Sequence, residues 1–221
     1  MGKMGIGYFD EAYRTGDRTY DDPTRSPYYP LFRGLVERLK RAGAANVLEV
    51  GCGSGVLAEM LIRAGLAYRG FDLSAVGVEK ARCRNPGADI WVANAADPRC
   101  YAGQFDAIVC CEVLEHIEED LDVIALWPKG SLCVCSVPNF DHEDHVRFFR
   151  TKSEILQRFE DALEMQSIDR FVKSPSAGLT WSGYFRRIRW ARENPKTLLG
   201  ILGLNRFNWY AGWFAFVARR R

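Results

Sequence analysis

The chain has only three histidines, and all of them lie in two short polar segments, at His116, His142 and His145. Each segment follows an apolar run that is typical of a buried strand, and each also carries carboxylates. An imidazole titrates near neutral pH, so it can take a proton from a reacting hydroxyl and release it again. The two segments therefore predict acid–base chemistry where they meet, with His145 as the first candidate for the general base and His142 as the second.

A second chemical signal comes from three glycines at alternate positions, Gly51, Gly53 and Gly55. They end the stretch N-V-L-E-V-G-C-G-S-G, which begins with an apolar run, and a helical pattern follows from Val56. Glycine permits positive φ and lets a ligand approach the backbone closely. The first turn of a helix has free N–H groups and a partial positive charge. The pattern therefore predicts a strand, a tight turn and a helix that together seat an anionic group of a cofactor.

The residues around the glycines distinguish between two cofactor classes, a dinucleotide and a cofactor with a cationic amino group. The dinucleotide fingerprint G-x-G-x-x-G/A requires a small residue where Val56 stands. Glu49 precedes the first glycine by two positions, where it would repel a pyrophosphate but suits a cationic amino group. Asp72 ends the next predicted strand, at the position where a carboxylate pairs with ribose hydroxyls in doubly wound folds. Asp72 is therefore compatible with both classes.

Four segments in order resemble the motifs of class I S-adenosylmethionine-dependent methyltransferases. V-L-E-V-G-C-G-S-G resembles their first motif and G-F-D-L-S their second, while Phe105–Ile117 and Ser131–Asn139 resemble two later strands with their turns. The resemblance covers about residues 36–163 and implies S-adenosyl-L-methionine as the cofactor. It also implies an α/β fold, a doubly wound Rossmann-like sheet of seven strands that is mostly parallel, with an antiparallel C-terminal strand pair.

The resemblance assigns cofactor-binding roles to the residues that match its motifs. It places the methionine end against Glu49, Gly51, Gly53, Gly55 and the backbone carbonyl of Cys111, the ribose at Asp72 and Leu73, and the adenine at Asn94 and Ala95. The family often has an acidic residue at the position of Asn94. Asn94 can accept the same hydrogen bond through its carbonyl, and Asp97 is the alternative. His116, within the common pattern E-V-L-E-H, is expected to brace its loop.

The acceptor is the least defined part of the prediction. S-V-P-N followed by H-V-R-F-F resembles small-molecule enzymes such as the ubiquinone-type O-methyltransferases, which implies a hydroxyl acceptor, with an amine as the second choice and no metal. E-x-x-E-H also resembles the small-RNA 3′-terminal 2′-O-methyltransferases. That alternative places a metal among Glu112, Glu115, His116 and either His145 or His142, beside an RNA ribose. A non-catalytic cofactor-binding subunit is the third reading.

The chemical residues are carried by alternating strands and helices, which indicates a parallel sheet with helices on both faces. The predicted strands are Asn46–Val50, Tyr68–Asp72, Asp89–Ala93, Phe105–Cys111, Leu132–Val137, Gln166–Val172 and Trp209–Ala218. The predicted helices are Pro30–Arg41, Val56–Ala64, Ala75–Arg84, about Glu115–Leu126, and Ser153–Leu163. The first thirty residues lack a long periodic stretch. One domain is expected over 1–221, with 1–30 as a lid or arm, 31–172 and 209–221 as the core, and 173–208 as a cap.

Aromatic and basic residues of the arm and the cap are the candidates for acceptor binding. They are Tyr13 and Tyr20 in the arm, where Tyr8 is a further lid candidate, and Trp181, Tyr184 and Arg186 in the cap. The net charge is +2, but residues 170–221 hold eleven Lys and Arg against one acid, which favours an anionic acceptor and leaves nucleic acid as an alternative partner. Seven cysteines without a C-x-x-C pair, and no signal or membrane-length apolar run, predict a cytoplasmic protein without a membrane partner.

Overall fold

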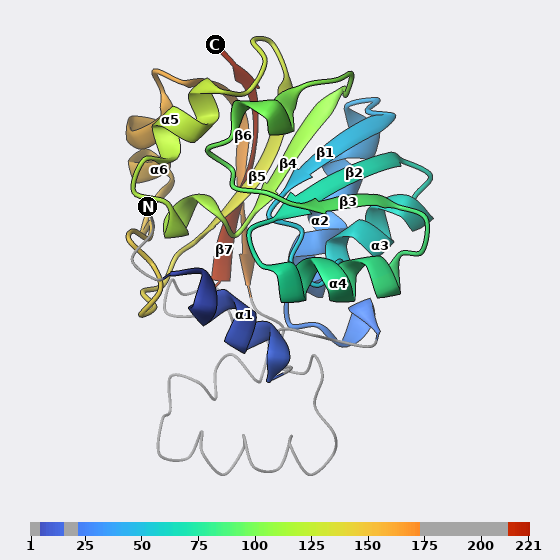
Figure 1. The fold of residues 1–221 in the computed structure, drawn as a ribbon. Helices are drawn as coiled ribbons and strands as arrows, with labels where there is room; N and C mark the ends of the chain where they lie inside the picture. The colour runs from blue at the N-terminus through green and yellow to red at the C-terminus, as the bar shows by residue number, and fades with distance from the viewer. Residues whose placement is uncertain (1–4, 16–21, 173–211) are drawn as a thin grey trace.

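A computed structural model describes residues 5–15, 22–172 and 212–221. The cap with Trp181, Tyr184 and Arg186, and also Tyr20 of the arm, lie outside these residues. The described part forms one seven-stranded sheet with helices on both faces (Figure 1). No helix within these ranges is both long enough and apolar enough to cross a membrane.

The strand order in the sheet is β3-β2-β1-β4-β5-β7-β6. The strands are β1 Asn46–Val50, β2 Ala67–Asp72, β3 Asp89–Val92, β4 Ala107–Cys111, β5 Leu132–Pro138, β6 Leu163–Val172 and β7 Gly212–Arg220. The first five run parallel, and β7 runs antiparallel to both β5 and β6. This order confirms the predicted doubly wound sheet with its antiparallel C-terminal pair. Its central strands are apolar on both faces because both are covered by helices.

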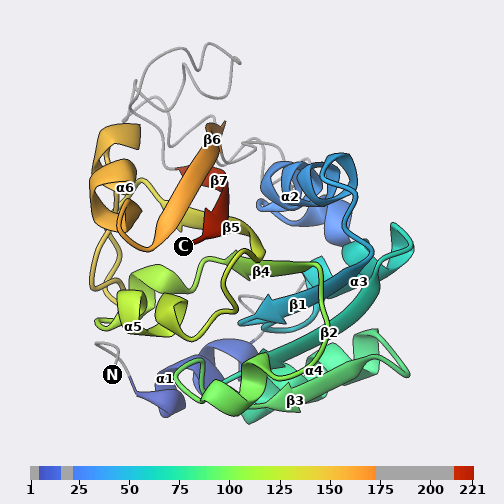
Figure 2. The same cartoon turned by 90° about the horizontal axis from the view of Figure 1, so that it is seen from above.

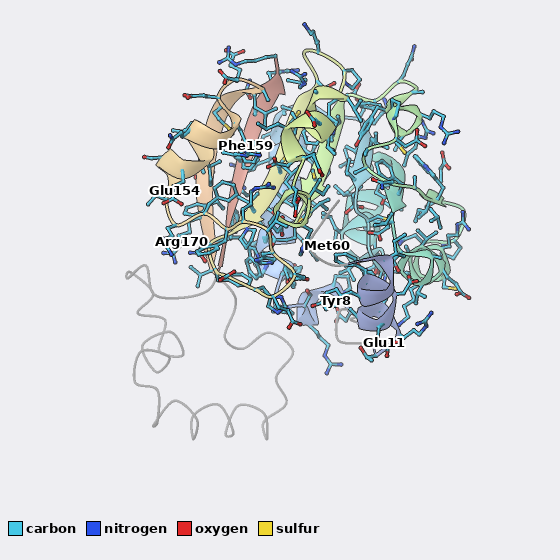
Figure 3. All side chains as sticks on the ribbon, turned by 60° about the vertical axis from the view of Figure 1, so that its left-hand side comes forward. Tyr8, Glu11, Met60, Glu154, Phe159 and Arg170 are labelled. Atoms are coloured by element: carbon cyan, nitrogen blue, oxygen red, sulfur yellow. The ribbon has the colours of Figure 1, made fainter. Side chains whose placement is uncertain are left out.

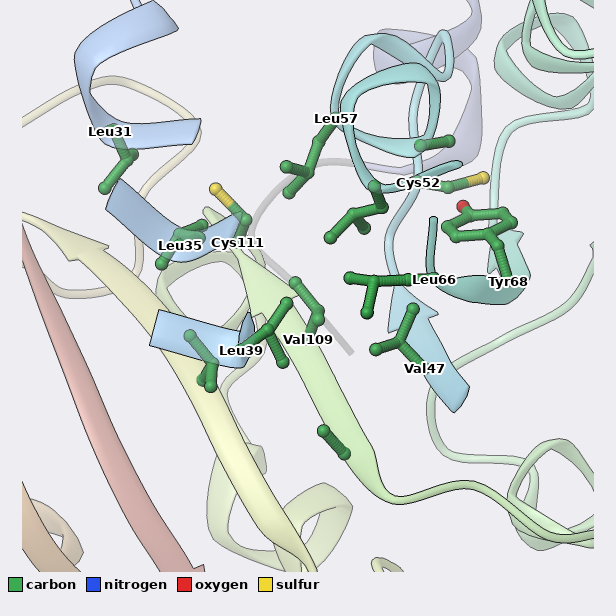
Figure 4. Packing of buried hydrophobic residues seen from close by; sticks show 14 of the residues in the cluster. Leu31, Leu35, Leu39, Val47, Cys52, Leu57, Leu66, Tyr68, Val109 and Cys111 are labelled. Atoms are coloured by element: carbon green, nitrogen blue, oxygen red, sulfur yellow. The ribbon is translucent and has the colours of Figure 1, made fainter. Parts of the chain in front are cut away.

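One apolar core lies on each side of the sheet. The helices are α1 Ile6–Arg14, α2 Tyr29–Arg41, α3 Val56–Arg63, α4 Ala75–Arg84, α5 Asp120–Ala125 and α6 Lys152–Phe159, with 3₁₀ turns at Pro23–Arg25, Pro98–Tyr101 and Leu114–His116. Figure 2 shows α2 and α3 on one side of the sheet and α5 and α6 on the other. Figure 4 shows Leu31, Leu35 and Leu39 of α2 at the spacing of one helix face, and α2 packs over β5, β6 and β7.

The helix predicted over Glu115–Leu126 is wrong in its first half. A 3₁₀ turn over Leu114–His116 comes first, and α5 begins only at Asp120. The guanidinium of Arg147 donates to the carbonyls of Leu114, Ile117 and Glu118, which removes those acceptors from a continuous helix. Arg147 also pairs with the buried Asp120 at 3.0 Å. The segment after β4 is therefore shaped by a residue that follows β5.

Two further differences concern helices α6 and α1. The helix predicted over Ser153–Leu163 ends at Phe159, and Leu163 already pairs with Arg220 as the first residue of β6. Helix α1 was not predicted, because nine residues between irregular segments do not form a long periodic stretch. Figure 1 shows α1 below the edge at which the parallel strands end, where doubly wound folds bind their ligands.

Candidate active site

The glycine loop after β1 has the backbone that the sequence predicts. The amides of Gly51 and Cys52 both donate to the carbonyl of Phe71, and all three glycines have positive φ. At Gly53 a Cβ atom would lie 2.6 Å from the hydroxyl of Tyr13, so a side chain there would displace the tip of Tyr13. At Gly55 it would lie 2.8 Å from the Cα of Ala81. Gly53 therefore keeps space beside a cavity, whereas Gly55 allows α3 to approach α4.

Asp72 at the end of β2 fastens the glycine loop to α4. Its two carboxylate oxygens accept from the amides of Gly53 and Ser74, each at 2.8 Å. Ser74 in turn caps α4 by accepting from the amide of Gly77. Each carboxylate oxygen has a second acceptor site, so Asp72 can accept further hydrogen bonds. Leu73 follows it directly in the chain.

The predicted adenine residues follow the neighbouring strand, β3. The amide of Ala93 donates to the carbonyl of Asp72, which places Asn94 next to the end of β2. The side-chain carbonyl of Asn94 accepts from the amide of Ala96 at 2.9 Å, and Asp97 pairs with the exposed Arg99 at 2.6 Å. Both candidates for the adenine contact are therefore engaged in local turns, and the choice between them stays open.

Glu49 is buried in β1 beneath the glycine loop. Its exposed fraction is 2%, and its carboxylate accepts a hydrogen bond from the Tyr68 hydroxyl at 2.5 Å. The pKa of Glu49 is raised to about 8, chiefly by burial; the hydrogen bond from Tyr68 opposes this rise and the negative charge of Asp72 adds to it. Glu49 therefore binds a proton readily until a cation approaches it.

The raised pKa predicts a pH-dependent stability. Between pH about 4.5 and about 8 the folded chain keeps the Glu49 proton, whereas the unfolded chain has lost it. The free energy of unfolding should therefore fall as pH rises through this window, and Glu49→Gln should remove that part of the decline. Chemical denaturation of both proteins at pH 5, 6.5 and 8 measures the difference. A difference between them that does not change with pH contradicts the prediction.

One cavity of about 620 Å³ joins the two chemical signals of the sequence. Its lining includes the predicted residues Tyr13, Glu49, Gly51, Gly53, Cys111, Glu112, Glu115, His116, His142 and His145. The predicted residues Gly55, Asp72, Leu73, Asn94 and Ala95 are not in the lining found for the described ranges. Sequence reasoning did not single out Tyr28, Phe32 and Phe140, which add aromatic surface. The volume lies in the range of small-molecule sites.

The turn after β4 is strained where it meets the cavity. Glu112 has a φ of 57°, a left-handed conformation that is uncommon outside glycine. Its carboxylate accepts from the Ser136 hydroxyl of β5 at 2.9 Å, which anchors the turn. Such strain persists only where the surroundings impose it, and it is frequent at functional sites. Cys111 and Glu112 both line the cavity as a result.

The three histidines converge on Asp144, a buried residue between His142 and His145. Asp144 accepts from the Nδ1 of His142 through its carboxylate, and its backbone carbonyl lies 3.1 Å from the Nδ1 of His116. The side chain of Asp144 is 1% exposed, whereas that of His142 is 47% exposed. With Nδ1 protonated toward Asp144, the Nε2 of His142 is left as a hydrogen-bond acceptor.

His145 has a different environment from His142. It is buried, and its Nδ1 lies 3.2 Å from the carbonyl of Phe140. Burial, with a smaller contribution from His116, lowers the pKa of His145 to about 4. A histidine with so low a pKa is a weak base at neutral pH. The geometry therefore favours His142, and the predicted preference for His145 stays an untested prediction that burial argues against.

Helix α1 contacts both halves of the cavity. On one side Asp10 bonds to the Ser74 hydroxyl, and the Tyr13 hydroxyl lies beside Gly53. On the other side the Tyr8 hydroxyl donates to Glu143 at 3.2 Å, and the ring of Phe9 packs edge-on against His116. Figure 3 labels Tyr8 and Glu11 on this helix. Tyr8 and Tyr13 both line the cavity, and movement of α1 as a lid stays a prediction.

Comparison with known proteins gives consistent matches. Residues 28–190 match a family model described as a methyltransferase domain. The chain is 29% identical over 212 residues to the ubiquinone biosynthesis O-methyltransferase of Methylococcus capsulatus, a match that covers 92% of this chain and 84% of the relative. It is 30% identical over 119 residues to the enzyme of the same name from Aromatoleum aromaticum, and here the match covers 52% of this chain and spans about half of the relative, 51% of its length.

A solved structure matches nearly the whole chain. It is the 1,6-didemethyltoxoflavin-N1-methyltransferase of Burkholderia thailandensis with 1,6-didemethyltoxoflavin and S-adenosylhomocysteine bound. The TM-score is 0.62 at 16% identity, over 97% of this chain and 86% of that one. At this identity the likeness concerns the fold alone.

Proposed function

The chain belongs to the class I S-adenosylmethionine-dependent methyltransferases, and on that premise we propose that it methylates a hydroxyl group on a small aromatic molecule, with His142 as the general base. The single observation that carries this proposal is the pairing of His142 with the buried Asp144 in the cavity that the glycine loop also lines. The cofactor seat and a supported base therefore share one cavity.

The residues around the loop fit the cofactor. S-adenosylmethionine, when bound, supplies the activated methyl group. The close approach to the backbone that Gly53 allows beside the Tyr13 hydroxyl, and the buried carboxylate of Glu49, suit an amino-acid tail, the first through shape and the second through charge. We assign the ribose to Asp72 and Leu73, and the adenine to Asn94 and Ala95, at the adjoining strand ends.

The acceptor hydroxyl must lose its proton as its oxygen forms the new bond to carbon. His142 can accept that proton on Nε2, because Asp144 holds its Nδ1–H and stabilises the imidazolium that forms. A neutral amine attacks through its lone pair and does not need this help. A histidine backed by a carboxylate therefore favours a hydroxyl over an amine.

The walls of the cavity indicate an aromatic acceptor. Tyr28, Phe32 and Phe140 offer ring surfaces, and the relatives named ubiquinone biosynthesis O-methyltransferase support O-methylation. The part of the lining that the structure describes holds no Lys or Arg. A preference for an anionic acceptor therefore depends on residues such as Arg186 in the cap.

A matched acceptor panel tests the proposal. Purified protein is supplied with S-adenosylmethionine and with pairs of phenols and anilines of equal ring substitution, and S-adenosylhomocysteine and the methylated product are measured by mass spectrometry. We expect O-methylated phenols at rates well above those of the paired anilines. Preferred N-methylation contradicts the hydroxyl assignment. Cofactor binding without turnover on any acceptor supports a non-catalytic subunit instead.

A metal-assisted reaction is the second candidate, because a specific group of side chains favours it. Glu115, His116 and His145 offer ligand atoms within 4.8 Å of one another, and so do His142, Asp144 and His145. A divalent ion there would lower the pKa of an acceptor hydroxyl, as in the RNA ribose methyltransferase reading. Full activity after exhaustive chelation supports the His142 base. Activity that is lost and then restored by a divalent metal supports the ion, and salt-sensitive retention on RNA would support an RNA acceptor.

A further inference from the structure

Tyr68 on β2 is a buried group that the reaction described above does not use. Its hydroxyl donates to Glu49 on the neighbouring strand at 2.5 Å, and the residue is 9% exposed. Parallel pairing of β1 and β2 sets Glu49 opposite Gly70, two positions beyond Tyr68. Figure 4 shows the Tyr68 ring beside Cys52 of the glycine loop. Tyr68 therefore lies beside Glu49 on the neighbouring strand and holds its carboxylate from within the sheet.

The space for the Tyr68 hydroxyl is provided by Gly70. Both residues lie on the same face of β2, since side chains two positions apart in a strand point the same way. A Cβ atom on Gly70 would lie only 2.1 Å from the Tyr68 hydroxyl. The hydrogen bond to Glu49 thus depends on a glycine in the middle of a strand, where glycine is otherwise unfavourable.

The groups around Glu49 indicate how the Tyr68 hydroxyl affects its charge. The titratable groups whose charge would act on Glu49 are Tyr68 and Asp72 on β2, Cys52 in the loop and Cys111 on β4, together with Cys110 on the opposite face of the sheet. Burial raises the pKa of each of these three thiols well above its ordinary value, so they remain neutral. Burial and Asp72 disfavour the charged form of Glu49, whereas the donated hydrogen bond favours it.

We propose that Tyr68 is a positioning residue for the cofactor, whose hydroxyl holds Glu49 as an oriented carboxylate for the ammonium group of the methionine end. The inference rests on the assignment of Glu49 under the proposed function. One oxygen of Glu49 accepts from Tyr68, which orients the other toward the cavity that Glu49 lines. Tyr68 acts through Glu49 and does not itself contact the cofactor.

Two ligands that differ only in the amino-acid tail test this role. S-adenosylhomocysteine carries the ammonium group, and 5′-methylthioadenosine has the same nucleoside without it. Titration calorimetry with Tyr68→Phe should show S-adenosylhomocysteine binding weakened about tenfold or more at pH 7.5, as expected for a lost hydrogen bond to a charged group. Binding of 5′-methylthioadenosine should be unchanged. The pH midpoint of S-adenosylhomocysteine binding should also move upward.

Other outcomes overturn the inference or its premise separately. Equal weakening of both ligands, or no weakening of either, excludes the positioning role of Tyr68. Glu49→Gln is measured beside it: if that variant loses affinity for S-adenosylhomocysteine while Tyr68→Phe does not, only Tyr68 is excluded. If Glu49→Gln has no effect, the assignment of Glu49 fails. Gly70→Ala, which crowds the hydroxyl, provides the same selective loss should Tyr68→Phe fold poorly.

Discussion

Replacement of His142 by alanine is expected to lower kcat by about 10²- to 10⁴-fold, the usual contribution of a general base. The affinity for S-adenosylhomocysteine should not change, because His142 belongs to the segment after β5 and not to the glycine loop. Asp144→Asn should also lower kcat, since an amide holds the imidazole less well and stabilises its charge less. Steady-state kinetics with the best phenol of the panel, together with calorimetry, measure both effects.

His145 provides the contrast in the same segment. His145→Gln should cost far less in kcat than His142→Ala, since His145 is buried with its pKa lowered to about 4. Thermal unfolding of each variant controls for loss of fold. A large loss of kcat for His145→Gln with an intact fold, beside a mild one for His142→Ala, would reverse the assignment and restore the order that the sequence predicts.

The second large effect is expected at the glycine loop. Gly53→Ala should reduce affinity for S-adenosylhomocysteine by about 100-fold or more, because the added methyl group would occupy space beside Tyr13 that an amino-acid tail requires. Calorimetry measures the loss. The rate at a fixed concentration of S-adenosylmethionine should fall together with this affinity. A higher concentration of S-adenosylmethionine should restore part of the rate.

A matched glycine separates the binding effect from backbone strain. Gly87 has a φ of 84°, compared with 53° at Gly53, but no atom lies within 4 Å of a Cβ built there. Gly87→Ala therefore introduces the strain of a left-handed alanine without blocking a ligand. It should lower stability modestly and leave cofactor affinity intact. Wild-type affinity in Gly53→Ala would show that the tail binds elsewhere.

The sheet was predictable because its strands are apolar runs separated by turn residues. Asn46–Val50 has the predicted bounds, and the glycine loop has the positive φ angles that its composition demands. The end of the helix predicted over Ser153–Leu163 was not predictable, since Leu163 leaves it to pair with Arg220. Local sequence pattern predicts secondary structure where neighbouring residues determine it, and fails where contacts between distant residues change it.

The candidate site was predictable as a set of residues but not in its internal roles. The two histidine segments could be placed together because the ends of adjacent parallel strands meet at one edge. His142 replaces His145 as the preferred general base because His145 is buried and His142 is not, and the spacing of residues in the sequence does not show burial. Tyr68 gave no signal at all, since a tyrosine in a strand is ordinarily a packing residue, and only the register with β1 brings it to Glu49.

Arg147 fixes the loop that carries the histidines, whereas the aromatic walls of the cavity do not depend on it. It ties the loop of Glu115 and His116 to the segment that ends in His145, through three carbonyls and the buried Asp120. The aromatic walls at Tyr28 and Phe32 belong to a different part of the chain and share none of these ties. Substitution of Tyr28 or Phe32, one at a time, should therefore change which acceptor fits the cavity while the His142–Asp144 pair keeps its geometry.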